Sequence, residues 1–381
     1  MKAVVCQNGA LSVSDLPAPR PGRGQVRLKV LRCGICGSDL HARHHSDELA
    51  DVAADMGYLQ SMRSTERTVF GHEFCGEILE YGPRCKRRAP VGSRVVAFPL
   101  RRAEEGIHPI GLSASAPGAY AEEVLVEESL MVPVPDALRT DIAAMTEPMA
   151  VGLHAVRRAK IRRGQIAVVI GAGPIGLAVV LMLKAQGVRT VIASDYSAAR
   201  RALAKRCGAD IVVDPATESP IDYVEQRRGY FTSSVAAMSL LLRATEAANT
   251  LPIPLWQAWR VLESMGVGPK APVIFECVGV PGVLNSVITS APIMSRIVVA
   301  GVCMGEDRLR LAMAINKELD IRFVLGYTPV EFRRTLRLLA KGKVDPTPLI
   351  TATVSLAEVD GAFEALASPD DHAKILIDPT A

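Results

Sequence analysis

Short hydrophobic segments alternate with glycine- and proline-rich turns along the first part of the chain. Apolar residues there alternate with polar ones or form brief β-branched runs, which predicts strands at 3–6, 11–16, 26–30, 74–80, 94–98 and 120–126. From residue 141 the period changes, and apolar residues recur at helical spacing: Ile142, Met145, Met149, Leu153 and Val156. We therefore expect a β-rich region over residues 1–150, followed by a linking helix.

Beyond the linking helix, predicted strands and helices alternate. A helix is expected at 198–206, and strands are expected at 167–170, 190–193, 211–213, 273–277, 296–300 and 321–325. Such alternation predicts a doubly wound parallel sheet, which binds ligands at the carboxyl ends of its strands. The last part of the chain is expected to return to the β-rich domain, with helices at 331–340 and 356–366 and a strand at 373–377.

Two long stretches do not fit this minimal scheme. Residues 216–269 separate neighbouring strands by far more than one helix requires, and they contain helix-like runs at 234–249 and 254–265 with Trp256 and Trp259. We expect a helical insert there that serves as a lid, an oligomer contact or a layer packed on the sheet. The second stretch is a long loop between Cys36 and His72, with an amphipathic piece at 47–56.

The segment 166–183, IAVVIGAGPIGLAVVLML, joins a predicted strand to a predicted helix through a glycine-rich turn. Its hydropathy also suits a membrane span, but the glycines and Pro174 interrupt it and no second such segment exists. Gly171, Gly173 and Gly176 form G-x-G-x-x-G, a pattern that permits a tight turn, close approach of the backbone to a pyrophosphate and close packing of helix on strand. The segment therefore predicts a dinucleotide site.

A carboxylate after the next predicted strand indicates which dinucleotide binds. Asp195 follows Gly176 by nineteen residues, where it would accept hydrogen bonds from the hydroxyls of the adenosine ribose. Its charge disfavours a 2′-phosphate, so NAD is preferred to NADP. Arg200 and Arg201 keep NADP as an alternative, because arginines near this turn could hold the extra phosphate.

Composition narrows the class of protein. A chain of 381 residues is too long for one ordinary core, so two domains are expected. The net charge of +4 is too small to imply nucleic acid or a membrane surface as a partner. The N-terminus has no apolar signal region, and the eight cysteines are spread along the chain, which is typical of a reduced, cytoplasmic protein.

Two short segments carry residues that suit a metal ion. Residues 32–41, RCGICGSDLH, follow a predicted strand, and residues 71–73, GHE, open another. A thiolate, an imidazole and a carboxylate suit zinc, and a set of three leaves the open coordination position that a catalytic zinc needs. The spacing alone leaves open that Cys33 and Cys36 are two buried cysteines without a metal.

Four motifs occur in order along the chain: RCGICGSDLH, GHE, EPMAVGLHA and VVIGAGPIGL. Together they resemble the zinc-dependent medium-chain alcohol dehydrogenase family, and most of all its sorbitol, butanediol and threonine dehydrogenase branch. The resemblance covers essentially the whole chain outside the two long stretches. It implies an α/β protein with a GroES-like β-rich catalytic domain, 1–152 and 328–381, and a Rossmann NAD-binding domain, 153–327, that carries the helical insert.

The resemblance also implies roles at a zinc site. Cys36 and His72 match residues that bind the zinc directly. Glu73 and Glu147 match two glutamates, one or the other of which completes the site, directly or through the metal-bound water. Asp39 matches a position that orients the histidine ligand.

Further positions match the proton path and the cofactor site of the family. Ser38 matches the hydroxyl that relays the released proton, and His41 matches the group that passes this proton outward to solvent. Lys374 matches a basic position that pairs with Glu73. The cofactor-binding residues are then Gly171, Gly173, Pro174, Ile175, Gly176, Asp195 and Arg200. Of the remaining candidates, Cys33 and His154 are expected to be structural, and His44 and His45 to lie in a solvated loop.

The departures from the family pattern also matter. Between residues 94 and 126, where many relatives carry four clustered cysteines for a structural zinc, this chain has none, so one catalytic zinc per chain is expected. We predict an NAD-dependent zinc dehydrogenase that oxidises a secondary alcohol, diol or polyol to a ketone and forms a homodimer or homotetramer. The alternatives are a zinc-free NAD(P)H-dependent enone or quinone reductase and a non-catalytic dinucleotide-binding sensor or scaffold.

Overall fold

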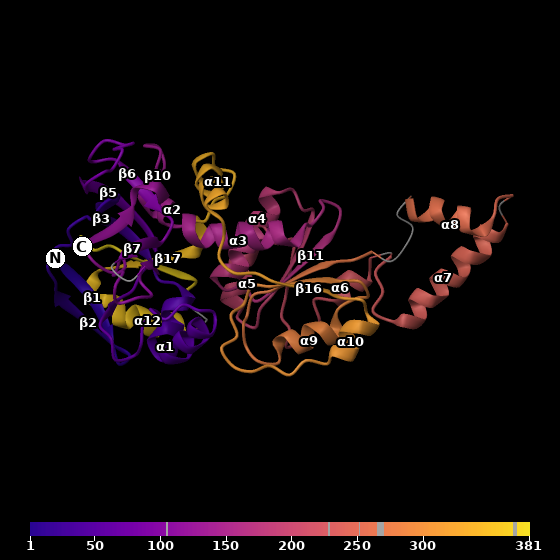
Figure 1. The fold of residues 1–381 in the computed structure, drawn as a ribbon. Helices are drawn as coiled ribbons and strands as arrows, with labels where there is room; N and C mark the ends of the chain where they lie inside the picture. The colour runs from indigo at the N-terminus through magenta and orange to yellow at the C-terminus, as the bar shows by residue number, and fades with distance from the viewer. Residues whose placement is uncertain (104–105, 228, 251, 265–269, 369–371) are drawn as a thin grey trace. The chain divides into compact units, whose positions relative to one another are not determined.

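The structure is a computed structural model that describes residues 1–381 except 104–105, 228, 251, 265–269 and 369–371. The chain folds into two compact units (Figure 1). One unit comprises Met1–His154 and Gly326–Ala381, and the other comprises Ala155–Leu325. Each unit is described by itself below.

A seven-stranded sheet forms the centre of the first unit, in the order β10-β6-β5-β3-β18-β17, with β9 also paired to β3. Its strands are β3 (Gln25–Gly34), β5 (Glu73–Tyr81), β6 (Arg94–Ala97), β9 (Glu123–Glu127), β10 (Met131–Pro133), β17 (Ile350–Val354) and β18 (Lys374–Ile377). Near the C-terminus, β18 runs antiparallel to β3 and places Ile377 opposite Cys33. The end of the chain therefore lies in the same sheet as its beginning.

Smaller strands and the helices complete the first unit. A three-stranded sheet has the order β2-β1-β4, with β1 (Lys2–Gln7), β2 (Ala10–Asp15) and β4 (Thr68–Val69), and β7 (Leu100–Ala103) pairs with β8 (Gly106–Pro109). The helices are α1 (Gly37–Asp55), α2 (Thr140–Ala144), α3 (Thr146–Ala159, which continues into the second unit), α11 (Pro329–Ala340) and α12 (Val359–Ala367), with single turns η1 (Glu128–Leu130), η2 (Thr347–Leu349) and η3 (Leu356–Glu358). One apolar core runs under these sheets and includes Leu28, Phe70, Ile78, Val126 and Phe363.

The segment after Cys36 differs from the sequence prediction, because it is a helix of 19 residues and not a loop. The Asp39 carboxylate accepts a hydrogen bond from the Cys36 amide at 3.0 Å and so caps the start of α1. His44 and His45, predicted in a solvated loop, are exposed as expected but lie on this helix, which is kinked at His45. The predicted linking helix is likewise divided, into α2 and α3. Pro148 has no amide hydrogen to continue the first helix into the second.

The second unit is built on a six-stranded parallel sheet in the order β13-β12-β11-β14-β15-β16. The strands are β11 (Ile166–Ile170), β12 (Thr190–Ser194), β13 (Ile211–Val213), β14 (Val273–Glu276), β15 (Arg296–Val299) and β16 (Asp320–Phe323). This is the strand order of a Rossmann sheet. Its helices are α4 (Pro174–Ala185), α5 (Ala198–Arg206), α6 (Asp222–Glu225), α9 (Val283–Ser290) and α10 (Leu311–Asn316). The doubly wound parallel sheet predicted from the sequence is confirmed.

The insert contains two helices, α7 (Ser234–Asn249) and α8 (Leu255–Ser264), as the sequence predicted, although the end of the second predicted run, residue 265, lies outside the described residues. Most of the large apolar side chains of these helices are exposed, among them Met238, Leu242 and Trp256. The hydrophobic segment 166–183 forms β11 and the first part of α4. Within the part of the chain that the structure describes, no helix is long and apolar enough to cross a membrane.

Candidate active site

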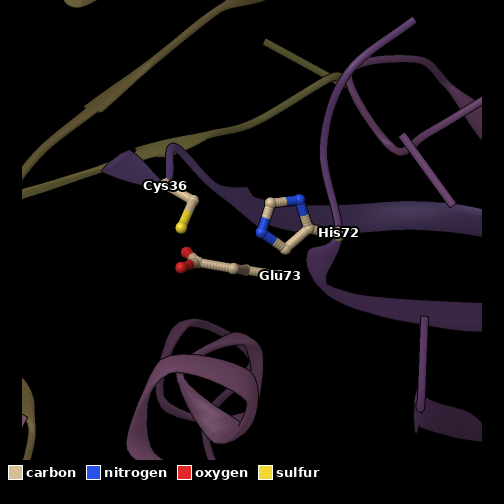
Figure 2. A group of neighbouring side chains, drawn as sticks. All are labelled: Cys36, His72 and Glu73. Atoms are coloured by element: carbon tan, nitrogen blue, oxygen red, sulfur yellow. The ribbon is translucent and has the colours of Figure 1, made fainter. Parts of the chain in front are cut away.

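Three potential metal ligands meet where β3 and β5 lie side by side. Cys36 follows β3 as the residue before α1, His72 directly precedes β5, and Glu73 is its first residue and pairs with Gly34 of β3. The sulfur of Cys36, a ring nitrogen of His72 and a carboxylate oxygen of Glu73 all lie within 4.8 Å of one another (Figure 2). Among the described residues, no other three histidine, cysteine or acidic side chains come together in this way.

The two ring nitrogens of His72 have different neighbours. Nδ1 lies 3.4 Å from Oδ1 of Asp39, a carboxylate with no exposed surface, and Nε2 lies 3.3 Å from Oγ of Ser38. Figure 2 shows a ring nitrogen turned toward Cys36 and Glu73. Because Asp39 occupies the Nδ1 side, Nε2 is the nitrogen that a metal would take.

Glu73 is held by a buried lysine. Nζ of Lys374 donates to both carboxylate oxygens of Glu73 and to the carbonyl of Ile35, each at 2.8 Å. Both side chains are only 1% exposed, so the predicted pairing of Lys374 with Glu73 is confirmed. Gly34 makes room for the carboxylate, since a Cβ at this position would come within 2.1 Å of Oε2 of Glu73.

Glu147, the other acidic candidate, lies on α3 outside the group of three donors. It is buried, and this burial raises the pKa of its carboxyl to about 7, while the nearby charge of His72 acts in the opposite direction. Burial and Glu147 itself hold the pKa of the neighbouring Tyr327 well above its usual range. The ring of Tyr327 stacks on Phe332 with the centroids 5.6 Å apart.

The remaining histidine and cysteine candidates lie in different environments. His41 is half-buried on α1, and burial, with a smaller effect of His45, lowers the pKa of its ring. His154 hydrogen-bonds Glu331 at 2.9 Å, and Cys33 is fully buried in the core, so both are structural as predicted.

The donor set fits zinc. A thiolate, an imidazole nitrogen and a carboxylate are the ligand types of catalytic zinc sites, and ligands about 2.0–2.3 Å from one ion can be reached from this cluster by small side-chain movements. Oδ1 of Asp39 and Nδ1 of His72 are buried and form no well-aligned hydrogen bond, which a small rotation of the ring toward a metal could correct. Burial lowers the pKa of His72, but Asp39 and Cys36 outweigh it and hold that pKa well above its ordinary value.

The glycine motif of the second unit has the geometry of a dinucleotide loop. Gly171 has a φ of +89°, and Gly173 with Pro174 begins α4, followed by Ile175. A Cβ on Gly176 would come within 1.9 Å of the Gly171 carbonyl oxygen, so α4 packs on the turn as closely as the motif predicts.

Asp195 and Arg200 lie beside this loop. The carboxylate of Asp195 accepts hydrogen bonds from the amides of Ala172 at 2.7 Å and Ser197 at 2.9 Å. A Cβ at Gly173 would lie 3.9 Å from the Arg200 guanidinium. Arg201 instead forms an ion pair with Asp214 at 3.0 Å.

Two tyrosines near the metal ligands were not found by sequence reasoning. Tyr120 donates a hydrogen bond to Asp39 at 2.7 Å, and Tyr327 lies near Glu147. Both residues lie far along the chain from the residue that each approaches. Neither belongs to one of the four motifs, so no local spacing could have indicated them.

Family models and curated relatives match most of this chain. Residues 22–136 match the alcohol dehydrogenase GroES-like domain, and residues 174–341 match the zinc-binding dehydrogenase family. The chain is 30% identical to (R,R)-butanediol dehydrogenase of Bacillus subtilis (strain 168), over 97% of this chain and 96% of that protein. It is 27% identical to sorbitol dehydrogenase of Bos taurus, over 96% of this chain and 92% of that protein.

A solved structure extends the comparison to three dimensions. A zinc-binding dehydrogenase from Sinorhizobium meliloti 1021, bound to NADP, is 26% identical and covers 99% of each chain with a TM-score of 0.75. The GroES-like and Rossmann-like fold, the ordered motifs and the identity along nearly the whole length agree. The chain therefore belongs to the zinc-dependent medium-chain dehydrogenase family.

Proposed function

We propose that this protein is a zinc- and NAD-dependent dehydrogenase that interconverts a secondary alcohol, diol or polyol and the corresponding ketone. The observation that carries the proposal is the cluster of Cys36, His72 and Glu73 within 4.8 Å, with a buried carboxylate behind the histidine. The names of the relatives, butanediol and sorbitol dehydrogenase, support the substrate class. The intact donor set speaks against the zinc-free reductase.

Each residue of the cluster has a distinct part in this proposal. Zn²⁺ bound there would lower the pKa of a coordinated alcohol, and NAD would accept the hydride. Cys36 and His72 hold the metal, and Asp39 keeps the His72 ring in the required orientation. Glu73 or Glu147 completes the site, and Lys374 balances the charge of Glu73.

A proton that leaves the alcohol needs a path to water, and we assign the path to α1. The Ser38 hydroxyl lies 3.3 Å from Nε2 of His72 and so borders the metal position. His41 follows one turn later on the same helix. Its ring is half-buried, and a histidine at this position can accept a proton and release it to solvent.

The cofactor preference rests on Asp195. Its carboxylate stands beside the glycine loop, where a ribose is expected and a 2′-phosphate would meet a negative charge. We therefore propose NAD as the preferred cofactor, with Pro174, Ile175 and Arg200 contributing to its binding beside the glycines. One structural relative is bound to NADP, so both cofactors must be tested with this protein.

Replacing Asp195 with asparagine is expected to shift the preference toward NADP. The asparagine side chain still accepts the hydrogen bond from the Ala172 amide, but it no longer repels the 2′-phosphate of NADP. The ratio of kcat/KM for NADP to that for NAD should therefore rise about tenfold or more. Initial rates with both cofactors measure this ratio. Asp210→Asn, which removes the negative charge paired with Lys184 in the same unit, is the control and should leave the ratio unchanged. An unchanged ratio in Asp195→Asn would show that another residue reads the ribose.

The stoichiometry and assembly complete the proposal. We propose one catalytic zinc per chain, no structural zinc, a small-molecule substrate, and a homodimer or homotetramer. The direct test is zinc content per chain of protein purified without added metal, combined with NADH formation on a panel of vicinal diols and polyols. We expect about one zinc per chain and absorbance of NADH with at least one member of the panel. Folded protein that takes up no zinc even after reconstitution would contradict the proposal.

A further inference from the structure

Tyr120 is tied to the segment that carries the ligand His72. Its amide donates to the carbonyl of Phe70 at 2.9 Å, and its own carbonyl accepts from Val4 of β1 at 2.8 Å. The side chain is fully buried, and the ring makes edge contacts with Phe70 and Phe363 at centroid distances of 6.4 Å and 6.2 Å. Its position is therefore fixed from both the backbone and the core.

The Tyr120 ring also lies directly against the residue before the ligand. A Cβ on Gly71 would come within 2.5 Å of Cδ1 of Tyr120, so only a glycine permits this approach. Gly71 has a φ of +102°, which also favours glycine. The close contact couples the position of the tyrosine to the backbone from which His72 projects.

The hydroxyl of Tyr120 reaches the carboxylate behind the ligand. It donates to Oδ2 of Asp39 at 2.7 Å, and the amide of Cys36 donates to the same oxygen at 3.0 Å. Oδ1, the other oxygen, is left to face Nδ1 of His72 at 3.4 Å. Two donors on one oxygen thus determine which oxygen is presented to the histidine.

We propose that Tyr120 is a positioning residue of the metal centre, which acts through Asp39 to aim Nε2 of His72 at the metal. The inference rests on the proposed zinc site. The amide of Cys36 alone leaves the carboxylate free to turn about its terminal bond, because a single donor fixes one oxygen but not the plane of the group. The tyrosine hydroxyl supplies the second constraint on a side chain with no access to water.

The test is Tyr120→Phe, which removes the hydroxyl and keeps the ring in the core. The probes are Zn²⁺ affinity, measured by competition with a chromogenic chelator, and the visible absorption spectrum of the Co²⁺-substituted protein. We expect Zn²⁺ to bind roughly tenfold more weakly and the Co²⁺ bands to shift, as for loss of an outer partner of a ligating histidine. Tyr81→Phe is the matched control, because it removes the hydrogen bond of 2.7 Å that the Tyr81 hydroxyl donates to the carbonyl of Ala89 in the same unit. This variant should bind as the wild type does.

A second pair of variants separates positioning from general loosening of the fold. If Tyr120 acts through Asp39, Asp39→Ala, which removes the acceptor of the Tyr120 hydroxyl, and the double variant Tyr120→Phe/Asp39→Ala should bind Zn²⁺ equally weakly. Losses that add in the double variant, or wild-type affinity and spectrum in Tyr120→Phe, would overturn the inference. Wild-type protein that binds no Zn²⁺ would instead contradict the proposed function, and this inference with it.

Discussion

Replacing Cys36 with alanine is expected to remove zinc from the protein and to reduce turnover by about a thousandfold or more. The thiolate is the strongest ligand of the cluster, and His72 with Glu73 alone cannot retain the ion against competing buffers. A bound zinc would lower the barrier for alcohol oxidation by several kcal/mol, and each 1.36 kcal/mol is worth a factor of ten in rate. Metal analysis and steady-state kinetics measure the two losses.

NADH binding separates this effect from unfolding. The glycine loop belongs to the second unit and Cys36 to the first, so the Cys36 variant should bind NADH nearly as well as the wild type. His72→Ala should show the same combination of losses. Cys303→Ala, at an exposed cysteine, is the control and should keep both zinc and turnover. Retained activity in Cys36→Ala at undetectable zinc would rule out a zinc-dependent mechanism.

The sheet strands of the fold could be predicted because their signals are local. β11 is apolar throughout, as a parallel strand buried on both faces must be, and Gly171 marks where it ends. The alternation of strands and helices then predicts that the strands of the sheet are parallel. In the first unit, alternating apolar residues such as Val26, Leu28 and Val30 identify β3 in the same way.

Helix α1 could not be predicted in full, for a physical reason. Its buried positions are Asp39, Ala42, Ser46 and Ala50, which recur at helical spacing but are small or polar. A periodicity of large apolar residues is therefore absent, and only the piece at 47–56 appeared amphipathic. Contacts made elsewhere hold the helix, including the ion pair of Arg43 with Asp360 at 2.7 Å.

The site shows the same division between local and distant signals. Cys36 and His72 lie in recognisable motifs at the ends of neighbouring strands, and the pairing of β3 with β5 brings them together. Tyr120, by contrast, is far from these motifs in sequence and reaches the site through its hydroxyl, which donates to Asp39. The role of Lys374 could be predicted only from the family resemblance. Its pairing with Glu73 depends on a strand near the C-terminus entering the sheet beside β3.

Replacing Lys374 with methionine is expected to cost the first unit about 3–5 kcal/mol of its free energy of unfolding, because Glu73 would be left as a buried charge without a partner. Burial lowers the pKa of Lys374, but Glu73 and Cys36 outweigh it and raise that pKa above its ordinary value, so the buried lysine keeps its charge. Chemical denaturation of the metal-free variant, followed by circular dichroism, measures the cost.

Two further variants identify the charge as the cause of this loss. In Lys374→Met/Glu73→Gln the unpaired charge is absent, so much of the lost stability should return, although the zinc site is then altered. Lys2→Met breaks an exposed pair with Asp15 in the same unit and should change stability by less than about 1 kcal/mol. Equal stability of Lys374→Met and the wild type would show that Glu73 takes up a proton or another partner when the lysine is lost. If the double variant is no more stable than the single one, the lysine stabilises the unit by packing and its contact with Ile35 and not by its charge.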